Sequence, residues 1–338
     1  NIKMNRLNIC LVGPGILPIK NQIPPIQITT DGWGAIEYLV DCLAKSMIKK
    51  GHIVDIVNFP NPIDSVNYIN SQDYDFIHLH YDNHINIFNH LCQKSFCTTT
   101  HYGYILKNNM WDLGYYDIFN HLLQSPGLIC LSPQIESLFA ANNPKGKYLT
   151  HLRNGTEVQE YKWRPDGNGR FICLGKVEPR KQQALLAQLA PNISIDFVGP
   201  VVDPNFKILS PNHNYLGNWT REEVKTKLTD YSGLILPSFG EAAALVVPEA
   251  LAAGLSLVIT KCSSANLISR PYIYVIPDEI HTIENLEDLL EKCLKNNYSY
   301  RTEAREYAVR YFDWAKIAEE YEKKIEEFLI YYPNEKSN

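Results

Sequence analysis

The feature that most constrains the fold is an alternation of short apolar runs with helical patterns, which occurs twice along the 338 residues. In the first half, runs typical of strands lie at 7–13, 52–59, 75–81, 95–101, 127–132 and 147–154. Between the first two, apolar residues from Trp33 to Ile48 recur at helical spacing, and Gly51 ends the predicted helix. Strands that alternate with helices predict parallel sheets with helices on both faces.

The second half restarts the same alternation after a turn-rich stretch. Strands are expected at 171–177, 193–199, 233–238, 255–260 and 273–277, and helices at 181–190, 220–231, 248–253, 282–296 and 300–332. The segment Thr220-Arg-Glu-Glu223 is typical of a capping box that opens a helix.

A chain of this length exceeds one ordinary core and favours two domains. The turn-rich segment 161–169 precedes a new strand, so the boundary is expected near 155–169. We predict an α/β protein with two Rossmann-like domains facing across a cleft, at 1–158 and 159–312, followed by a C-terminal helix at 313–338. This helix is expected to cross back to the first domain through the apolar residues Trp314, Ile317, Ala318, Tyr321, Ile325 and Phe328.

Composition excludes several classes of protein. The net charge of −5 argues against a nucleic-acid binder, which would present a basic face. No apolar run approaches the ~20 residues of a membrane span, although peripheral membrane contact through the first domain stays open. The first residues lead directly into an apolar strand-like segment, so no signal peptide is expected. The eight scattered cysteines include no C-x-x-C pair, which favours reduced thiols and a cytoplasmic location.

Two carboxylates stand in the apolar segment SFGEAAALVVPEALAAG, residues 238–254. Pro248 and Gly254 are typical of the first turn and of the position after the end of a helix. Glu249 then lies in the first helical turn and Glu241 in the preceding loop, at the carboxyl end of a strand, where α/β sheets bind ligands. A carboxylate there can accept two hydrogen bonds from a vicinal diol such as a ribose. The alternative is that Glu249 only stabilises the helix N-terminus.

The helix that follows Glu241 also predicts an anion site. The backbone N–H groups of Leu245 and Val246 are expected to point out of its N-terminus and to hold an anion such as a diphosphate.

These motifs, taken in order, resemble the retaining, family-4 glycosyltransferases of GT-B fold. The resemblance rests on the E-x7-E pair after a strand ending in Pro-Ser, the phosphate loop FICLGKVEPRKQQALLAQL, the interdomain turn RNGTE, the strand end TTTHYG, a glycine loop before the first helix, and the final helix FDWAKIAEEYEKKIEEFL. It covers nearly the whole chain.

The resemblance implies roles for basic and acidic residues of the second domain. Lys176 and Lys181 match the two positions that hold the donor diphosphate. The family usually has arginine at the first position, and Arg180 offers a compensating charge. Glu249 matches the ribose-binding glutamate, and Glu241 matches a residue beside the donor sugar. Ala243-Ala244 replace the usual Phe-Gly, which places the identity of the donor sugar in doubt.

The resemblance also implies roles in the first domain. His101 matches a histidine near the donor sugar, with an ordinary histidine at a strand end as the alternative. Gly32 and Gly34 match a glycine loop that approaches diphosphate and acceptor, where glycine permits positive φ and close approach. Their alternative is an ordinary turn before a helix.

The function implied is transfer of a sugar, with retention, from a nucleotide-diphosphate sugar to a hydroxyl of a glycan or other acceptor. UDP-sugar is favoured over GDP-sugar, and no divalent metal or cofactor is expected. Glu241, Lys176, Lys181 and His101 are the expected catalytic residues, and none is assigned as a nucleophile. Two alternatives stay open: an epimerase or phosphorylase of the same fold, and a non-catalytic protein that binds nucleotide sugars or glycans. The oligomeric state is not predicted.

Three other patterns carry less weight. Asp73-Tyr74-Asp75 looks like a metal-binding D-x-D but precedes a strand, so we interpret it as a polar lead-in. His78, His80 and His84 are closely spaced, but no nearby cysteine or acid completes a zinc site. The segment Gly13–Pro18 begins like a dinucleotide fingerprint but has proline in place of the third glycine, which disfavours a dehydrogenase.

Overall fold

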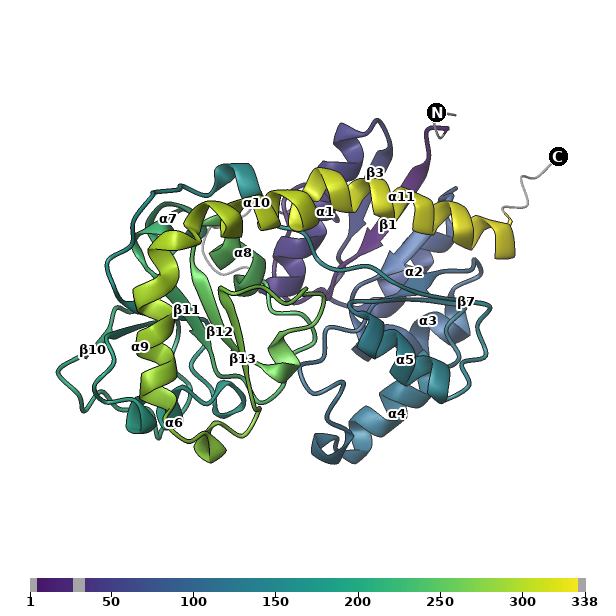
Figure 1. Ribbon diagram of the computed structural model, residues 1–338. Helices are drawn as coiled ribbons and strands as arrows, with labels where there is room; N and C mark the ends of the chain where they lie inside the picture. The colour runs from purple at the N-terminus through teal and green to yellow at the C-terminus, as the bar shows by residue number, and fades with distance from the viewer. Residues whose placement is uncertain (1–4, 27–33, 334–338) are drawn as a thin grey trace. The chain divides into compact units, whose positions relative to one another are not determined.

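The computed structural model describes residues 5–26 and 34–333. The chain divides into two compact units (Figure 1). Unit 1 comprises Asn1–Asn154 and Trp314–Asn338, and unit 2 comprises Gly155–Asp313. Each unit is built on its own parallel sheet.

Unit 1 contains, in its described part, a seven-stranded sheet of order β2-β3-β1-β4-β5-β6-β7. Its strands are β1 (Asn8–Val12), β2 (Gln22–Ile23), β3 (Ile53–Val57), β4 (Phe76–Leu79), β5 (Cys97–Thr98), β6 (Gly127–Cys130) and β7 (Tyr148–His151). Its helices are α1 (Ala35–Lys49), α2 (Pro62–Asn70), α3 (Ile85–Leu91), α4 (Leu113–Leu122), α5 (Pro133–Ala141) and α11 (Trp314–Tyr331).

The central strand of unit 1 is β1, which pairs in parallel with β3 on one side and β4 on the other. Ile9 stands opposite both Val54 and Phe76, and β1 is buried from Ile9 onward. A strand covered on both faces requires a continuous apolar run, which the sequence supplies. Strand order reverses between β1 and β4, and ligands bind at such switch points in open α/β sheets.

Helix α11 belongs to unit 1, where it runs beside α1 (Figure 1). It buries Trp314, Ile317, Ala318, Tyr321, Ile325 and Phe328, the face predicted from the sequence. The Phe328 ring packs edge-on against Phe76 of β4, with the ring centroids 5.4 Å apart. The predicted return of the C-terminal helix to the first domain is thus confirmed.

Unit 2 contains a six-stranded parallel sheet of order β10-β9-β8-β11-β12-β13 among its described residues. The strands are β8 (Phe171–Leu174), β9 (Ile195–Val198), β10 (His213–Tyr215), β11 (Gly233–Leu236), β12 (Ser256–Thr260) and β13 (Ile273–Ile276). The helices are α6 (Gln183–Leu189), α7 (Arg221–Lys227), α8 (Val246–Ala252), α9 (Leu286–Asn296) and α10 (Arg301–Phe312). The order reverses between β8 and β11, which makes their carboxyl ends the switch point of this unit.

Local signals in unit 2 act as the sequence predicts. The Thr220 side chain accepts a hydrogen bond from the Glu223 N–H, and the Glu223 carboxylate accepts one from the Thr220 N–H, which completes the capping box of α7. Gly254 follows α8 with φ of +89°, a left-handed conformation that favours glycine.

Several elements differ from the sequence-based prediction. The single helix expected at 300–332 is two helices, because Asp313 between them is extended and its segment bridges to Thr156. Helices α2 to α5 were not predicted, because they are short and expose much of their length. Asn61-Pro62 and Ser132-Pro133 open two of them, a cap followed by proline at the first position that could have located both. No helix in the described parts of the chain combines the length and the apolar character needed to span a membrane.

Candidate active site

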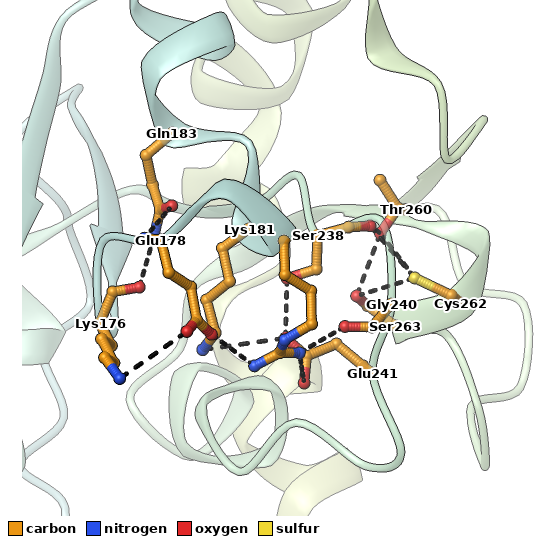
Figure 2. A network of polar contacts seen from close by, with 11 residues as sticks. Lys176, Glu178, Lys181, Gln183, Ser238, Gly240, Glu241, Thr260, Cys262 and Ser263 are labelled. Carbon is orange, nitrogen blue, oxygen red and sulfur yellow. Dashed lines mark hydrogen bonds and ion pairs between the residues drawn. The ribbon is translucent and has the colours of Figure 1, made fainter. Parts of the chain in front are cut away.

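The loops that follow β8 and β11 meet at the switch point of unit 2. The first loop carries Lys176, Arg180 and Lys181, and the second carries Ser238 and Glu241. Lys176, Lys181, Ser238 and Glu241 are labelled in Figure 2. Parallel strands end at the same edge of a sheet, so these side chains converge although about 60 residues separate them.

Glu241 is the centre of this group. Its side chain is 9% exposed. Ser238 donates a hydrogen bond from Oγ to Glu241 Oε1 at 2.7 Å. Arg180 Nη1 lies 3.3 Å from Oε2, and Lys181 Nζ lies 3.8 Å from Oε1. Two cations and a hydroxyl therefore compensate one nearly buried carboxylate.

Arg180 ties the two loops together. It donates to the Gly240 carbonyl at 2.5 Å and to Glu178 Oε1 at 2.6 Å. Burial alone would lower the pKa of this guanidinium, but the charges of Glu241 and Glu178 outweigh burial and raise the pKa. Arg180 is therefore cationic whenever the protein is folded.

Lys176 and Lys181 differ in exposure. The Lys176 side chain is 53% exposed, and its Nζ lies 3.9 Å from Glu178 Oε2. The Lys181 side chain is only 16% exposed and lies over Gly175, where a Cβ atom would come 3.0 Å from Nζ. Gly175 has φ of +142°. A side chain at this position would be strained in its backbone and would crowd the lysine.

Glutamine side chains brace the basic loop. Gln182, with φ of +55°, caps α6 and donates from Nε2 to the carbonyls of Pro237 and Asp278, each at 2.7 Å. Gln183 donates from Nε2 to the Lys176 carbonyl at 2.9 Å (Figure 2). These bonds hold the backbone of the cationic loop against the neighbouring strand ends.

Glu249 forms a second, separate ion pair in unit 2. It lies in the first turn of α8, as predicted, and is only 3% exposed. Its carboxylate pairs with Arg221 of α7, and Arg221 also donates to the Tyr161 hydroxyl at 3.1 Å. Burial, followed by the negative charge of Glu249, raises the pKa of Tyr161. The Glu249 carboxylate thus shares Arg221 with a hydroxyl that stays protonated.

Leu245 and Val246 lie at the start of α8, which spans Val246–Ala252 with Leu245 as its N-cap. As at any helix start, the first backbone N–H groups have no partner within the helix. The Leu245 side chain is half-buried and that of Val246 is buried, so both residues would contact a ligand mainly through their backbone.

Unit 1 contains an open pocket of about 440 Å³ beside its own switch point. Its lining residues come from the loops after β4 and β5 and from α1 and α4: Ile36, Tyr81, Asp82, Asn83, His101, Tyr102, Asp112, Gly114, Tyr115 and Ile118. The volume falls within the ~300–1,000 Å³ typical of small-molecule pockets. None of these described lining residues is a lysine or an arginine, so the pocket offers no fixed positive charge to an anion.

Hydrogen bonds and ring stacking fix the side chains around this pocket. Asp82 Oδ2 accepts hydrogen bonds from Thr100 Oγ1 at 2.5 Å and from the Tyr115 hydroxyl at 3.0 Å. Burial raises the pKa of Asp82 despite these bonds. Tyr102 stacks on Tyr115, with the ring centroids 3.7 Å apart.

His101 lies at the end of the β5 run and lines the pocket, where the sequence places it. Burial lowers its pKa to about 4, so the ring is neutral at pH 7. Its Nε2 lies 3.4 Å from His80 Nδ1.

The glycine loop is only partly described. Gly32 lies outside the described residues. Gly34 is the N-cap of α1 with φ of −68°, so it does not use the positive φ that glycine permits. A Cβ atom here would come 2.5 Å from Glu37 Oε2, so a larger residue would require the Glu37 side chain to move. Burial of Glu37 raises the pKa of its carboxyl group.

The structure brings some of the sequence-predicted residues together and leaves others apart. Glu241, Lys181 and, through Glu178, Lys176 form one network, while Glu249 lies in the pair with Arg221. Sequence reasoning missed Ser238 and Arg221, and it treated Arg180 only as a compensating charge. In the sequence, Ser238 is marked only by its place at the end of a strand and Arg221 only by its place at the start of a helix. Neither position shows which residue the side chain contacts.

The weaker patterns have structural explanations. Asp75 accepts a hydrogen bond from the Asn8 N–H at 2.8 Å and Asp73 pairs with Lys94, as expected of a polar lead-in to β4. In the described parts of the chain, no three histidine, cysteine, aspartate or glutamate side chains are grouped so that they could hold a metal ion.

Comparison with known proteins places these units among glycosyltransferases in fold. Residues 159–311 match the family model described as glycosyl transferases group 1. Sucrose-phosphate synthase from Thermosynechococcus elongatus is a structural neighbour, with a TM-score of 0.74 and 16% identity over 96% of this chain and 100% of that one. HepE from Anabaena, solved with UDP and glucose, gives a TM-score of 0.71 and 14% identity over 95% and 100%.

A third neighbour is AviGT4, a glycosyltransferase involved in avilamycin A biosynthesis. It gives a TM-score of 0.69 and 16% identity over 96% of this chain and 98% of that one. No curated protein matches the sequence. The predicted GT-B fold class, with two parallel-sheet α/β domains, is thereby confirmed.

Proposed function

We propose that the protein is a retaining glycosyltransferase that moves a sugar from a nucleotide-diphosphate sugar to a hydroxyl group of an uncharged acceptor. One observation carries the proposal. Arg180 and Lys181 pair with Glu241 at the switch point of unit 2, and Lys176 joins them through Glu178, inside the segment that matches the group 1 glycosyltransferase model. A cluster of cations at the carboxyl edge of a parallel sheet suits a diphosphate.

Different residues of unit 2 bind different parts of the donor. Lys176 and Lys181 bind the diphosphate, and the first N–H groups of α8, at Leu245 and Val246, add hydrogen bonds. Glu249 accepts hydrogen bonds from the ribose hydroxyls, and Glu241 binds hydroxyl groups of the donor sugar. Arg180 and Ser238 hold Glu241 in place.

In the transfer step, the bond between C1 of the sugar and the diphosphate oxygen breaks, and its electron pair stays on the phosphate. The acceptor oxygen bonds to C1 on the same face, and the hydroxyl proton passes to the departing diphosphate. The lysine charges stabilise the negative charge that develops, so no divalent metal is needed. UDP is the favoured nucleotide, supported by the neighbour HepE, which was solved with UDP-glucose.

The pocket of unit 1 is the proposed acceptor site. His101 lines this pocket, Gly34 is the N-cap of α1 in the same unit, and the tyrosine rings and carboxylates suit a polyhydroxyl ligand. The lack of lysine or arginine among its described lining residues disfavours phosphorylated or carboxylated acceptors. A cytoplasmic location is also proposed, supported by the burial of six of the eight cysteines.

The test is nucleotide release from a panel of UDP- and GDP-sugars, with and without a pool of neutral and acidic glycans, in buffer with EDTA. The wild type is compared with Glu249→Gln, which keeps the shape of the side chain, and with Glu222→Gln, an 85% exposed control on α7. We expect acceptor-dependent release from one donor, and a loss of about 10–100-fold in kcat/KM only for Glu249→Gln, because each charge-assisted hydrogen bond contributes about 1.5–3 kcal/mol.

Other outcomes would identify the alternatives. Sugar phosphate formed from glycan and inorganic phosphate would indicate a phosphorylase, and conversion of a UDP-sugar into its epimer would indicate an epimerase. Nucleotide binding that depends on Glu249 but never leads to turnover would indicate a binding protein. An inverted product anomer would contradict retention.

A further inference from the structure

Three imidazole rings lie next to one another at the carboxyl ends of β4 and β5 in unit 1; those of His78 and His80 are buried, and that of His101 is half-buried. The rings of His78 and His80 have centroids 3.9 Å apart, and those of His80 and His101 are 5.7 Å apart. Burial lowers the pKa of His78 to about 3 and that of His101 to about 4, and it lowers the pKa of His80 strongly. All three rings are neutral at pH 7, so each carries one proton, on either Nδ1 or Nε2.

The two hydrogen-bond partners of His78 determine which ring nitrogen carries its proton. Thr99 Oγ1 donates its only proton to the Ile129 carbonyl at 2.7 Å, so it must accept from His78 Nε2, which lies 2.7 Å away. His78 Nδ1 therefore accepts from the Tyr321 hydroxyl at 2.6 Å. The neighbouring side chains hold His78 as the Nε2–H tautomer.

His80 has a hydrogen-bond partner for only one of its two ring nitrogens among the described residues. Its Nδ1 lies 3.4 Å from His101 Nε2, a long hydrogen bond in which one ring donates and the other accepts. Its Nε2 is buried and has no hydrogen-bond partner among the described residues. A buried polar atom without a partner costs about 1–3 kcal/mol, so native proteins nearly always supply one.

A small cavity lies beside His80. It has a volume of about 30 Å³, and His80, Asn154 and Trp314 are among its lining residues. Within the described residues, Asn154 Nδ2 and Trp314 Nε1 are also buried without hydrogen-bond partners. The side chains of His80 and Trp314 are 6% and 8% exposed. The cavity has room for one or two water molecules.

The donors and acceptors of this cavity match those of water. Trp314 Nε1 can only donate, and the Asn154 amide nitrogen can only donate. A water molecule that accepts from both has its own protons left to give, and His80 Nε2 can accept one of them. His80 then carries its proton on Nδ1 and donates it to His101 Nε2, which leaves the proton of His101 on Nδ1.

We infer that a water molecule bound by Asn154, Trp314 and His80 fixes His101 as the Nδ1–H tautomer, so that His101 donates a hydrogen bond to a ligand oxygen in the pocket of unit 1. Asn154, Trp314 and His80 are thus positioning residues that act through His101. The nature of the ligand rests on the proposed function, whereas the water site and the tautomer do not.

The test is long-range ¹H–¹⁵N NMR of the full-length protein labelled with ¹⁵N-histidine, since the nitrogen shifts of neutral imidazole distinguish its tautomers. In the wild type at pH 7 we expect His78 as Nε2–H, and His80 and His101 as Nδ1–H. Trp314→Phe removes one donor from the water site. We expect mixed tautomers for His80 and His101 in this variant and no change for His78, whose partners are untouched.

The inference fails if His101 is the Nε2–H tautomer in the wild type, or if Trp314→Phe leaves all three rings unchanged. If this variant does not fold, the wild-type spectrum and a high-resolution crystal structure still decide, because the structure must contain a water within hydrogen-bond distance of His80 Nε2. These measurements need no turnover. A wrong tautomer with normal sugar transfer would refute only this inference, and the predicted tautomer without any transfer would refute only the proposed function.

Discussion

At the scale of single residues, the two lysines of the phosphate loop are not equivalent. Lys181 is held over Gly175 beside Glu241 and is mostly buried, whereas Lys176 is half exposed. A charge that is already oriented and partly desolvated contributes more to binding an anion than a mobile, solvated one. We predict that Lys181→Ala weakens UDP binding about 10–100-fold and that Lys176→Ala weakens it less than about fivefold, measured by calorimetry.

Lys227→Ala is the matched control, because Lys227 is 45% exposed and lies in the same unit but on α7. It should leave UDP affinity unchanged. Equal losses for Lys176→Ala and Lys181→Ala would show that burial does not rank the two lysines. Equal losses for all three variants would show that only the net charge of unit 2 matters.

At the scale of elements, α7 depends on its capping box. Thr220→Ala removes the side chain that accepts from the Glu223 N–H, which leaves one of the first N–H groups of the helix without a protein partner. We predict a loss of about 0.5–2 kcal/mol in the free energy of unfolding of unit 2, measured by urea denaturation followed by hydrogen exchange. Thr226→Ala, in the same helix but away from the cap, is the control and should change stability by less than about 0.5 kcal/mol. A larger loss for Thr226→Ala would contradict the role of the cap.

At the scale of the whole molecule, the two units should respond differently to acid. His78, His80 and His101 of unit 1 have folded-state pKa values well below the unfolded value of about 6.5. The unfolded chain takes up protons that the folded unit excludes, so stability is complete above pH 6.5 and falls as the pH drops toward 4. Each excluded proton costs up to about 1.4 kcal/mol per pH unit in this window.

Carboxyl groups act at lower pH. In unit 2, burial of Asp196 is outweighed by hydrogen bonds from Arg170, Tyr231 and Asn214, and its pKa is lowered. The stability that it contributes is lost only as the pH falls below about 4. Glu37 and Asp82 of unit 1 have raised pKa values. Each takes up its proton in the folded unit at a pH above the unfolded value of about 4, so these two carboxyl groups partly oppose the three histidines as the pH falls toward 4.

We therefore predict that unit 1 loses hydrogen-exchange protection between pH 6.5 and 4.5 while unit 2 retains it. Hydrogen exchange with mass spectrometry, compared at pH values corrected for the intrinsic exchange rate, would measure both units in one sample. Simultaneous loss in both units, or earlier loss in unit 2, would contradict the assignment of neutral histidines.

Much of the fold was predictable from local patterns. The buried face of α11 could be named residue by residue, because helical spacing alone decides which side chains share a face. Apolar runs located the strands of both sheets except the edge strands β2 and β10, which were not predicted. A strand covered on both faces is apolar along its whole length, whereas these two edge strands are short and partly polar. The break at Asp313 could not be seen, because it depends on a bridge to Thr156, more than 150 residues away.

Some features of the candidate site were also predictable from the sequence, and others were not. The sequence by itself determined the parallel α/β units, the face of α11, the capping box of α7 and the place of Glu241 at a strand end, because each depends on neighbours along the chain. Only the tertiary structure decided that Arg180 and Ser238 hold Glu241, that Arg221 pairs with Glu249, and that Tyr321 and Thr99 orient His78. Charge and hydrogen-bond partners are set by distance in space, and the folding of a sheet brings together side chains whose separation in the sequence carries no signal of the contact.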